Sequence, residues 1–129
     1  MRYLRRPNFR RPTTRVGAEA ETVALAHLQD AGLRLVMRNY RTPGRGGGEI
    51  DLVMHDPKDH TLVFVEVRHR ADLMHGGAGA SITRTKQRRI VFAAQHFLSQ
   101  LRTLPPCRFD AVLVEEGRLE WVQGAFEAS

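Results

Sequence analysis

Two acidic residues interrupt apolar stretches of the sequence, and they are the residues best suited to chemistry. Asp51 lies in GEIDLV, residues 48–53, and Glu66 lies in FVEVR, residues 64–68. Burial of a carboxylate within such a strand is costly unless another group compensates its charge. Two carboxylates that meet across a hairpin are compensated most simply by a divalent cation, so the pattern points to phosphodiester chemistry.

Strand alternation and a hairpin would bring these two acids together. The predicted connection, residues 56–61, has a length compatible with a hairpin. A shift of one residue in the pairing would separate Asp51 from Glu66 and remove the site. If the two acids do face each other, the same register sets two further pairs opposite one another: Val53 with Phe64, and Glu49 with Arg68.

A helix predicted over residues 17–31, ended by Gly32, carries a third acid of interest. At about 100° per residue, Glu21 falls within the apolar face and Glu19 points away from it. Glu21 is then either a third carboxylate or water-positioning group of the metal site, or an edge residue whose head reaches water. The helix pattern does not separate these two interpretations. The apolar face consists of Ala20, Ala24, Leu28 and Ala31.

A second, longer helix is predicted to follow Ser81 as its N-cap and to run to about Leu101. Lys86 and Gln87 flank its apolar face in the first turn, so either can reach the end of the sheet. A helix N-terminus also favours an anion at that position. Three arginines project outward, either into solvent or toward a nucleic-acid backbone: Arg84, Arg88 and Arg89.

The remaining strands are predicted over residues 33–41, 108–115 and 118–123, the last two joined by a hairpin at Glu116-Gly117. The element order is therefore α-β-β-β-α-β-β, an α/β arrangement. We expect a disordered basic arm over residues 1–15, a single domain over residues 16–124 and a tail over residues 125–129.

The excess positive charge lies in the first 15 residues. The chain has 20 basic and 14 acidic residues, a formal net charge of +6. Six arginines and no acid lie in residues 1–15, so the rest is balanced. Such an arm suggests contact with an anionic polymer; the alternatives are a solubilising tail or sequence upstream of the true start. The candidate nucleic-acid contacts are Arg5, Arg6, Arg10, Arg11, Arg15, Arg70, Arg84 and Arg88.

Several classes of protein are excluded by composition. No run of about 18 apolar residues predicts a membrane span, and no apolar stretch follows the basic N-terminus as in a secretory signal. The single cysteine, Cys107, excludes an internal disulfide, and the six histidines lack the paired spacing of zinc sites. We therefore expect a cytoplasmic protein in a reducing compartment.

An Asp followed about fifteen residues later by Glu-x-Arg, in this element order, resembles the PD-(D/E)XK nuclease superfamily. The chain more closely resembles the YraN-like family (uncharacterised protein family UPF0102), whose members are similar to archaeal Holliday-junction resolvases. The resemblance covers roughly residues 17–115. The stretches that carry it are E21xxAxxxL with Gly32, RNYR (38–41), GEIDLV (48–53), FVEVRxR (64–70), K86xxRI with Ala93-Ala94, and RFD (108–110).

The resemblance implies a restriction-endonuclease-like αβββαβ core, a central mixed sheet flanked by two helices, with a C-terminal hairpin strand. It implies Mg²⁺ or Mn²⁺ bound by Asp51, Glu66 and the backbone carbonyl of Val67, and by Glu21 through water. The implied activity is cleavage of DNA, including branched or distorted DNA, and by analogy a homodimer. The implied catalytic residues are Glu21, Asp51, Glu66 and Arg68, with Lys86 or Gln87 as the accessory helix residue.

One departure from the superfamily bears on activity. Its lysine is replaced by Arg68, which stays protonated and supplies only charge and hydrogen bonds. One alternative is therefore a non-catalytic nucleic-acid-binding module that keeps the fold. Another is a structural role, in which Asp51 and Glu66 form ion pairs with Arg68 and Arg70.

Overall fold

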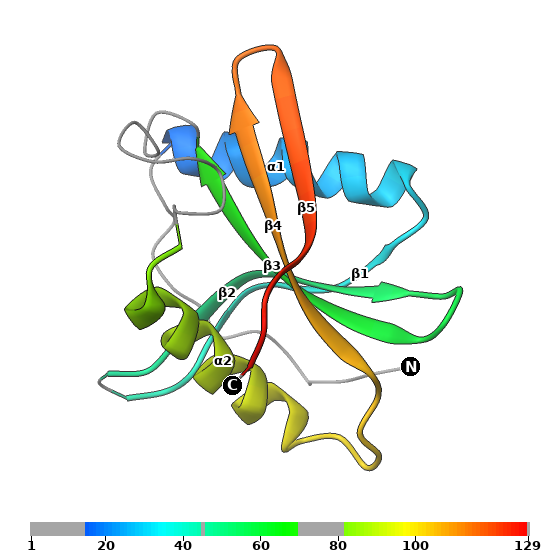
Figure 1. The fold of residues 1–129 in the computed structure, drawn as a ribbon, viewed down its shortest axis with the longest axis vertical. Coiled ribbons are helices and arrows are strands. Elements are labelled where there is room, and N and C mark those ends of the chain that lie inside the picture. Colours follow the sequence, from blue (N-terminus) through cyan, green and yellow to red (C-terminus); the bar gives the residue numbers. More distant parts are fainter. Residues whose placement is uncertain (1–14, 45, 70–81, 129) are drawn as a thin grey trace.

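The computed structural model describes residues 15–44, 46–69 and 82–128. Two helices and five strands follow one another in the predicted order (Figure 1). Their bounds are α1 Arg15–Asp30, β1 Arg34–Arg41, β2 Glu49–Asp56, β3 Thr61–His69, α2 Arg84–Leu98, β4 Cys107–Glu115 and β5 Arg118–Phe126.

All five strands form one sheet in the order β1-β2-β3-β4-β5. β3 and β4 are parallel, because α2 crosses between them, and the other neighbours are antiparallel. β3 is the central strand, and all of its residues from Thr61 to Glu66 are buried. The expected α/β fold with a central mixed sheet is confirmed.

The two helices cover opposite faces of the sheet. Alternating residues of β3 belong to two separate apolar clusters: Val63 and Val65 pack with α1, whereas Leu62 and Phe64 pack with α2. The α1 cluster includes Leu28, which is fully buried. Because each face needs its own helix, neither half of the chain could cover the sheet alone.

The end of α1 follows directly from the sequence. Gly32, at φ +104°, lets the amide of Leu33 donate to the carbonyl of Leu28 at 3.0 Å, while its own amide donates to Gln29 at 2.9 Å. This is a Schellman motif, which favours glycine at the left-handed position. Ala31, predicted on the buried face, is exposed because the helix ends at Asp30.

Three predicted boundaries were wrong. α2 ends at Leu98 and not near Leu101. The N-cap of α2 is Thr83 and not Ser81: the Thr83 side chain accepts a hydrogen bond from the Lys86 amide at 3.1 Å. Ser81 itself lies outside the described residues. β5 continues to Phe126, three residues beyond its predicted end, because Phe126 pairs with Phe109 across a register shift.

The turn before β2 is fixed against α2, and this positions the start of the acidic strand. The Thr42 hydroxyl accepts a hydrogen bond from the Gly48 amide at 2.8 Å, and the Thr42 amide donates to the Gly48 carbonyl at 3.0 Å. A Cβ on Gly48 would lie 1.9 Å from the carbonyl oxygen of Arg89, so only glycine allows this close approach.

Candidate functional site

β2 separates from β3 at the point where the acidic residues begin. The two strands pair as predicted at Val53–Phe64, but the pairing ends at Leu52–Val65 although both strands continue. Asp51 and Glu66 are therefore the first residues beyond the paired region. β3 keeps its pairing with β4 as far as His69, so it is β2 that moves away.

The alternation of β2 side chains between the two faces of the sheet is also interrupted at this point. Ile50 and Val53 pack in the same cluster, on the α2 face, whereas Leu52 packs on the α1 face. In β1, Asn39 lies between the residues paired with Ile50 and Leu52 and has a left-handed φ of 53°. The irregularity lets acids from both faces of the sheet approach one another, which a flat ladder would prevent.

Where backbone pairing between β2 and β3 has ended, the side chain of Asp51 bonds to β3 instead. Its Oδ2 accepts a hydrogen bond from the backbone amide of Val67 at 2.8 Å. Burial raises the pKa of Asp51 well above its ordinary value, and the neighbouring charges of Glu66, Glu21 and Glu49 raise it further. Among the described residues, Asp51 has no cationic partner within 4 Å.

Glu66, in contrast, is compensated by two cations. It is 4 % exposed, and its Oε2 lies 3.3 Å from Arg68 and 3.6 Å from Lys86 of α2. The structural alternative is therefore half right: Glu66 pairs with Arg68, but Asp51 does not. Arg70 lies outside the described residues.

The other two acids of the group have arginine partners on β1. Glu21 is buried, as predicted from the face of α1, and its Oε1 lies 3.8 Å from Arg38. Glu49 lies opposite Arg41, 3.5 Å from its guanidinium. The expected Glu49–Arg68 pair was wrong, because β2 leaves β3 before that position and turns its acid toward β1.

Lys86 reaches the site and Gln87 does not. The Gln87 amide donates to the carbonyl of Ile82 at 2.9 Å and so braces the start of α2. Of the two residues that the sequence left open, Lys86 is therefore the one that lies beside Glu66. Because Lys86 is 43 % exposed, its ammonium can also contact a bound anion.

Two carboxylate oxygens of the site have no partner in the described part of the chain. They are Oδ1 of Asp51 and Oε1 of Glu66. Three other polar atoms nearby are buried without a hydrogen-bond partner among the described residues: Nε of Arg38, Oδ1 of Asn39 and Nε of Arg68. Such atoms are uncommon in native proteins and call for an explanation.

Within residues 15–44, 46–69 and 82–128, no three Asp, Glu, His or Cys side chains are grouped closely enough to hold a metal ion. The predicted convergence of three carboxylates on one ion is thus not formed. What the structure brings together is the Asp51–Glu66 pair, with Val67 beside it and Glu21 farther off on α1.

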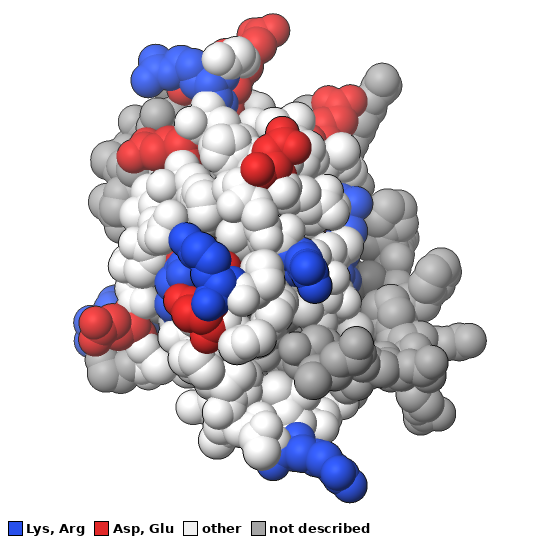
Figure 2. All heavy atoms as spheres, turned by 90° about the vertical axis from the view of Figure 1, so that its right-hand side faces the viewer, with Lys and Arg blue, Asp and Glu red and all other residues white. Residues whose placement is uncertain are grey.

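Two of the predicted nucleic-acid contacts are described, and neither belongs to this group. Arg84 and Arg88 are exposed on α2, where they line a shallow hollow with Phe92. On the face seen in Figure 2, basic groups are separated by uncharged surface among the described residues. Arg15 begins α1, but its side chain is not described; Arg5, Arg6, Arg10, Arg11 and Arg70 lie outside the described residues.

One acid was given no role by the sequence analysis. Asp110 of β4 is completely buried, and Arg108 Nε donates to both of its oxygens at 3.0 and 3.2 Å. It also accepts hydrogen bonds from the Trp121 indole at 2.9 Å and the Gly124 amide at 3.0 Å. The Arg-x-Asp spacing, which places both side chains on one face of a strand, could have predicted the ion pair but not the two donors from β5.

Comparison with known proteins agrees with this geometry. The model of uncharacterised protein family UPF0102 matches residues 20–114, which include every member of the acidic group. The chain belongs to this family. The resemblance to the YraN-like family drawn from the sequence motifs is thereby confirmed.

UPF0102 proteins from three bacteria are similar over most of their length. The protein of Albidiferax ferrireducens is 67% identical over 112 residues, 87% of each chain. That of Paracidovorax citrulli is 64% identical over 120 residues, 92% of this chain and 88% of its own. That of Verminephrobacter eiseniae is 66% identical over 113 residues, 87% of this chain and 78% of its own. In the present UPF0102 chain, neither described helix is both long and apolar enough to cross a membrane.

Proposed function

We propose that this UPF0102 protein is a Mg²⁺- or Mn²⁺-dependent endonuclease acting on DNA, including branched or otherwise distorted DNA. One observation carries the proposal: Asp51 is an acid without a cationic partner in the described chain, beside Glu66, where β2 leaves β3. An uncompensated acid of this kind, beside a second acid, is destabilising unless a cation offsets its charge. Raised carboxyl pKa values cluster at functional sites for the same reason.

The donors available fit a hard divalent cation. Asp51 Oδ1 and Glu66 Oε1 are carboxylate oxygens with no hydrogen bond or ion pair within the described ranges, and the backbone carbonyl of Val67 is next to the amide that donates to Asp51. Mg²⁺ is typically held by one or two carboxylates and keeps several waters, so three acidic ligands are not required. When bound, the cation supplies a water of lowered pKa and neutralises charge on the phosphate.

The remaining charged residues have distinct tasks in this proposal. Arg68 and Lys86 bind non-bridging phosphate oxygens, and both already point to the same oxygen of Glu66. Glu21 positions a water from the α1 side, with Arg38 holding its carboxylate. Because an arginine side chain stays protonated, Arg68 cannot act as the general base and supplies only charge and hydrogen bonds.

DNA is the proposed partner because the arm of residues 1–15 carries six arginines and no acid. Contacts of this kind release counterions, so binding should weaken steeply with salt. Cleavage of both strands of a branched substrate would require two sites. A homodimer is therefore part of the proposal, and light scattering in the presence of DNA tests it.

A second function is favoured by the two cations on Glu66. Lys86 and Arg68 compensate this acid without any metal, as expected for a nucleic-acid-binding module that has lost turnover. That module would bind DNA in a salt-dependent way and give no metal-binding heat. Calorimetry with Mn²⁺ separates the two functions.

The decisive experiment is cleavage of plasmid and four-way-junction DNA with Mg²⁺, Mn²⁺ or EDTA. We expect metal-dependent cleavage by the wild-type chain and a loss of about a hundredfold or more in Asp51→Asn, since even outer-shell changes at metal sites cost 10–100-fold. Arg68→Lys is expected to cleave faster, because lysine can release a proton.

The matched control is Asp59→Asn, which removes an exposed acid in the turn between β2 and β3, at the opposite end of these strands from Asp51 and Glu66. It should cleave as the wild type does. The nuclease proposal would be refuted if no DNA form, with either metal, showed cleavage that is present in the wild type and absent in Asp51→Asn. The nucleic-acid-binding module would then remain.

A further inference from the structure

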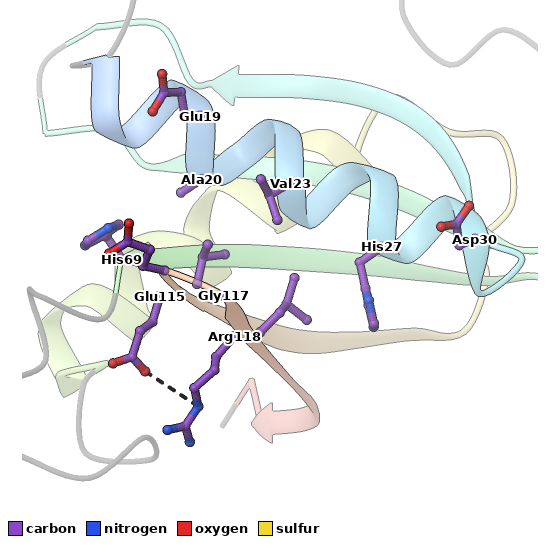
Figure 3. Close-up of a pocket in the computed structure, with 12 residues that line it drawn as sticks. Glu19, Ala20, Val23, His27, Asp30, His69, Glu115, Gly117 and Arg118 are labelled. Carbon is purple, nitrogen blue, oxygen red and sulfur yellow. Dashed lines mark ion pairs between the residues drawn. The ribbon is translucent and has the colours of Figure 1, made fainter.

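A groove of about 540 Å³ lies on the α1 side of the sheet, apart from the acidic site (Figure 3). One wall is α1, with Ala20, Val23 and His27, and the other is the turn between β4 and β5. Val23 is 48 % exposed, and a second hollow continues from it along Ala18 and Thr22. A large apolar side chain left open beside a hollow indicates a place for another chain segment.

The rim of this groove is acidic. Glu19 and Asp30 lie on α1, and Glu115 and Glu116 lie at the turn, against one cation, Arg118, which lies 4.0 Å from Glu115. Neither Asp30 nor Glu116 has an ion-pair partner within the described ranges. The floor, in contrast, is apolar and includes Val114 and Leu119. A matching segment would combine several cations with a few apolar side chains.

The residues that precede α1 have this composition. Residues 1–14, MRYLRRPNFRRPTT, contain five arginines, no acid, and the apolar side chains of Tyr3, Leu4 and Phe9. They join α1 only a few residues before Glu19. Fourteen residues can extend about 45 Å, whereas α1 is about 24 Å long, so the segment can fold back along the whole groove.

We propose that residues 1–14 dock in the groove between α1 and the β4–β5 turn, through arginine contacts to the rim and apolar contacts to Val23. The connection is short, so the effective concentration of the segment at the groove is in the millimolar range or above. Nucleic acid would compete with the groove for the same arginines. Docking itself requires neither nucleic acid nor metal and does not depend on the endonuclease proposal.

Limited trypsin digestion of the full chain tests docking. Trypsin cuts after Arg2, Arg5 and Arg10, while the bonds after Arg6 and Arg11 precede proline and resist. Neutralising the rim with Asp30→Asn and Glu116→Gln should raise the rate of these cleavages roughly fivefold at low salt, the effect of two or three exposed ion pairs. The matched control, Asp59→Asn with Glu127→Gln, removes the same charge elsewhere and should leave the rate unchanged.

Trp121 gives a second readout without a protease. It is the only tryptophan of the chain, and its ring lies edge-on, at 6.0 Å, to His27, which lines the groove. Replacing Arg5, Arg6, Arg10 and Arg11 by Gln should change Trp121 emission as the rim variant does. Combining the two sets should add nothing further, because both remove one interaction.

Three results would overturn the proposal. The first is equal cleavage of the rim and control variants, or additive changes in Trp121 emission. The second is a rate increase after Arg70 in place of the N-terminal sites, which would assign the groove to residues 70–81. The third is protection that depends on protein concentration together with a dimer, which would assign it to a second copy.

Discussion

Two aspartates lie on either side of β3 and differ in how their charges are compensated. Asp110 is on β4, opposite Val65 of β3. Asp51 is on β2, one residue before Leu52, which pairs with the same Val65. Asp110 receives hydrogen bonds from Arg108, Trp121 and Gly124. Asp51 receives one, from the Val67 amide, and faces other acids.

The difference separates a structural acid from a candidate functional one. Asp110 joins β4 to β5, and its charge is satisfied wholly by protein groups. In Asp51, one carboxylate oxygen has no hydrogen-bond partner within the described residues, and no cation among them compensates its charge. The number of hydrogen-bond donors and the sign of the neighbouring charges distinguish the two acids.

The largest difference between the two aspartates is expected in what each contributes to the free energy of unfolding. Asp110→Asn should lower the free energy of unfolding by about 3 kcal/mol or more, because Arg108 then keeps a buried charge without its partner. Asp51→Asn should change it by less than about 1 kcal/mol, or raise it, because the amide removes repulsion from Glu66. Urea denaturation measures both values. A loss as large in Asp51→Asn as in Asp110→Asn would remove the distinction.

A divalent cation should stabilise the folded chain by binding at the site that contains Asp51. Mn²⁺ at a hundred times its dissociation constant should raise the free energy of unfolding by about 2.7 kcal/mol, because it binds the folded state. Thermal unfolding with Mn²⁺ and with EDTA measures this for wild type, Asp51→Asn and the control Asp59→Asn. An equal rise in Asp51→Asn would show that the ion binds elsewhere.

The free energy of unfolding should also depend on pH through Asp51. The pKa of Asp51 in the folded chain lies well above its ordinary value of 3.8, because of burial and the charge of Glu66. Between these two values the folded state binds more protons than the unfolded state, so stability falls as pH rises through that window. In EDTA, wild type should lose stability relative to Asp51→Asn above pH 3.8. A constant difference from pH 3.5 to about 8 would contradict the raised pKa.

The smallest expected difference is between the cations that pair with these acids, Lys86 beside Glu66 and Arg108 beside Asp110. Lys86→Gln should cost less than about 1 kcal/mol, because Lys86 is half exposed, and should strengthen Mn²⁺ binding a few-fold by freeing Glu66. Arg108→Gln should destabilise the chain more, because Asp110 is wholly buried. Paired denaturation and Mn²⁺ calorimetry decide this. Weaker Mn²⁺ binding in Lys86→Gln would mean that Lys86 orients the site.

Much of the site could be predicted because its residues depend on local rules. Helical periodicity directs Glu21 inward, and strand alternation with a short hairpin sets Val53 opposite Phe64. Lys86 lies in the first turn of α2 beside the sheet, as its phase predicts. The Gly32 motif ends α1 through contacts within seven residues. These features need no knowledge of distant parts of the chain.

The sequence by itself determined the element order, the family, and which acids face inward, because periodicity and motif spacing are properties of neighbouring residues. The tertiary structure alone decided the charge balance. That β2 leaves β3 after Leu52, that Glu49 turns to Arg41, and that Asp51 has no cationic partner in the described chain all depend on strands far apart in sequence. The donors from β5 to Asp110 belong to the same class. Whether a buried carboxylate is satisfied depends on every group around it, and only the fold brings those groups together.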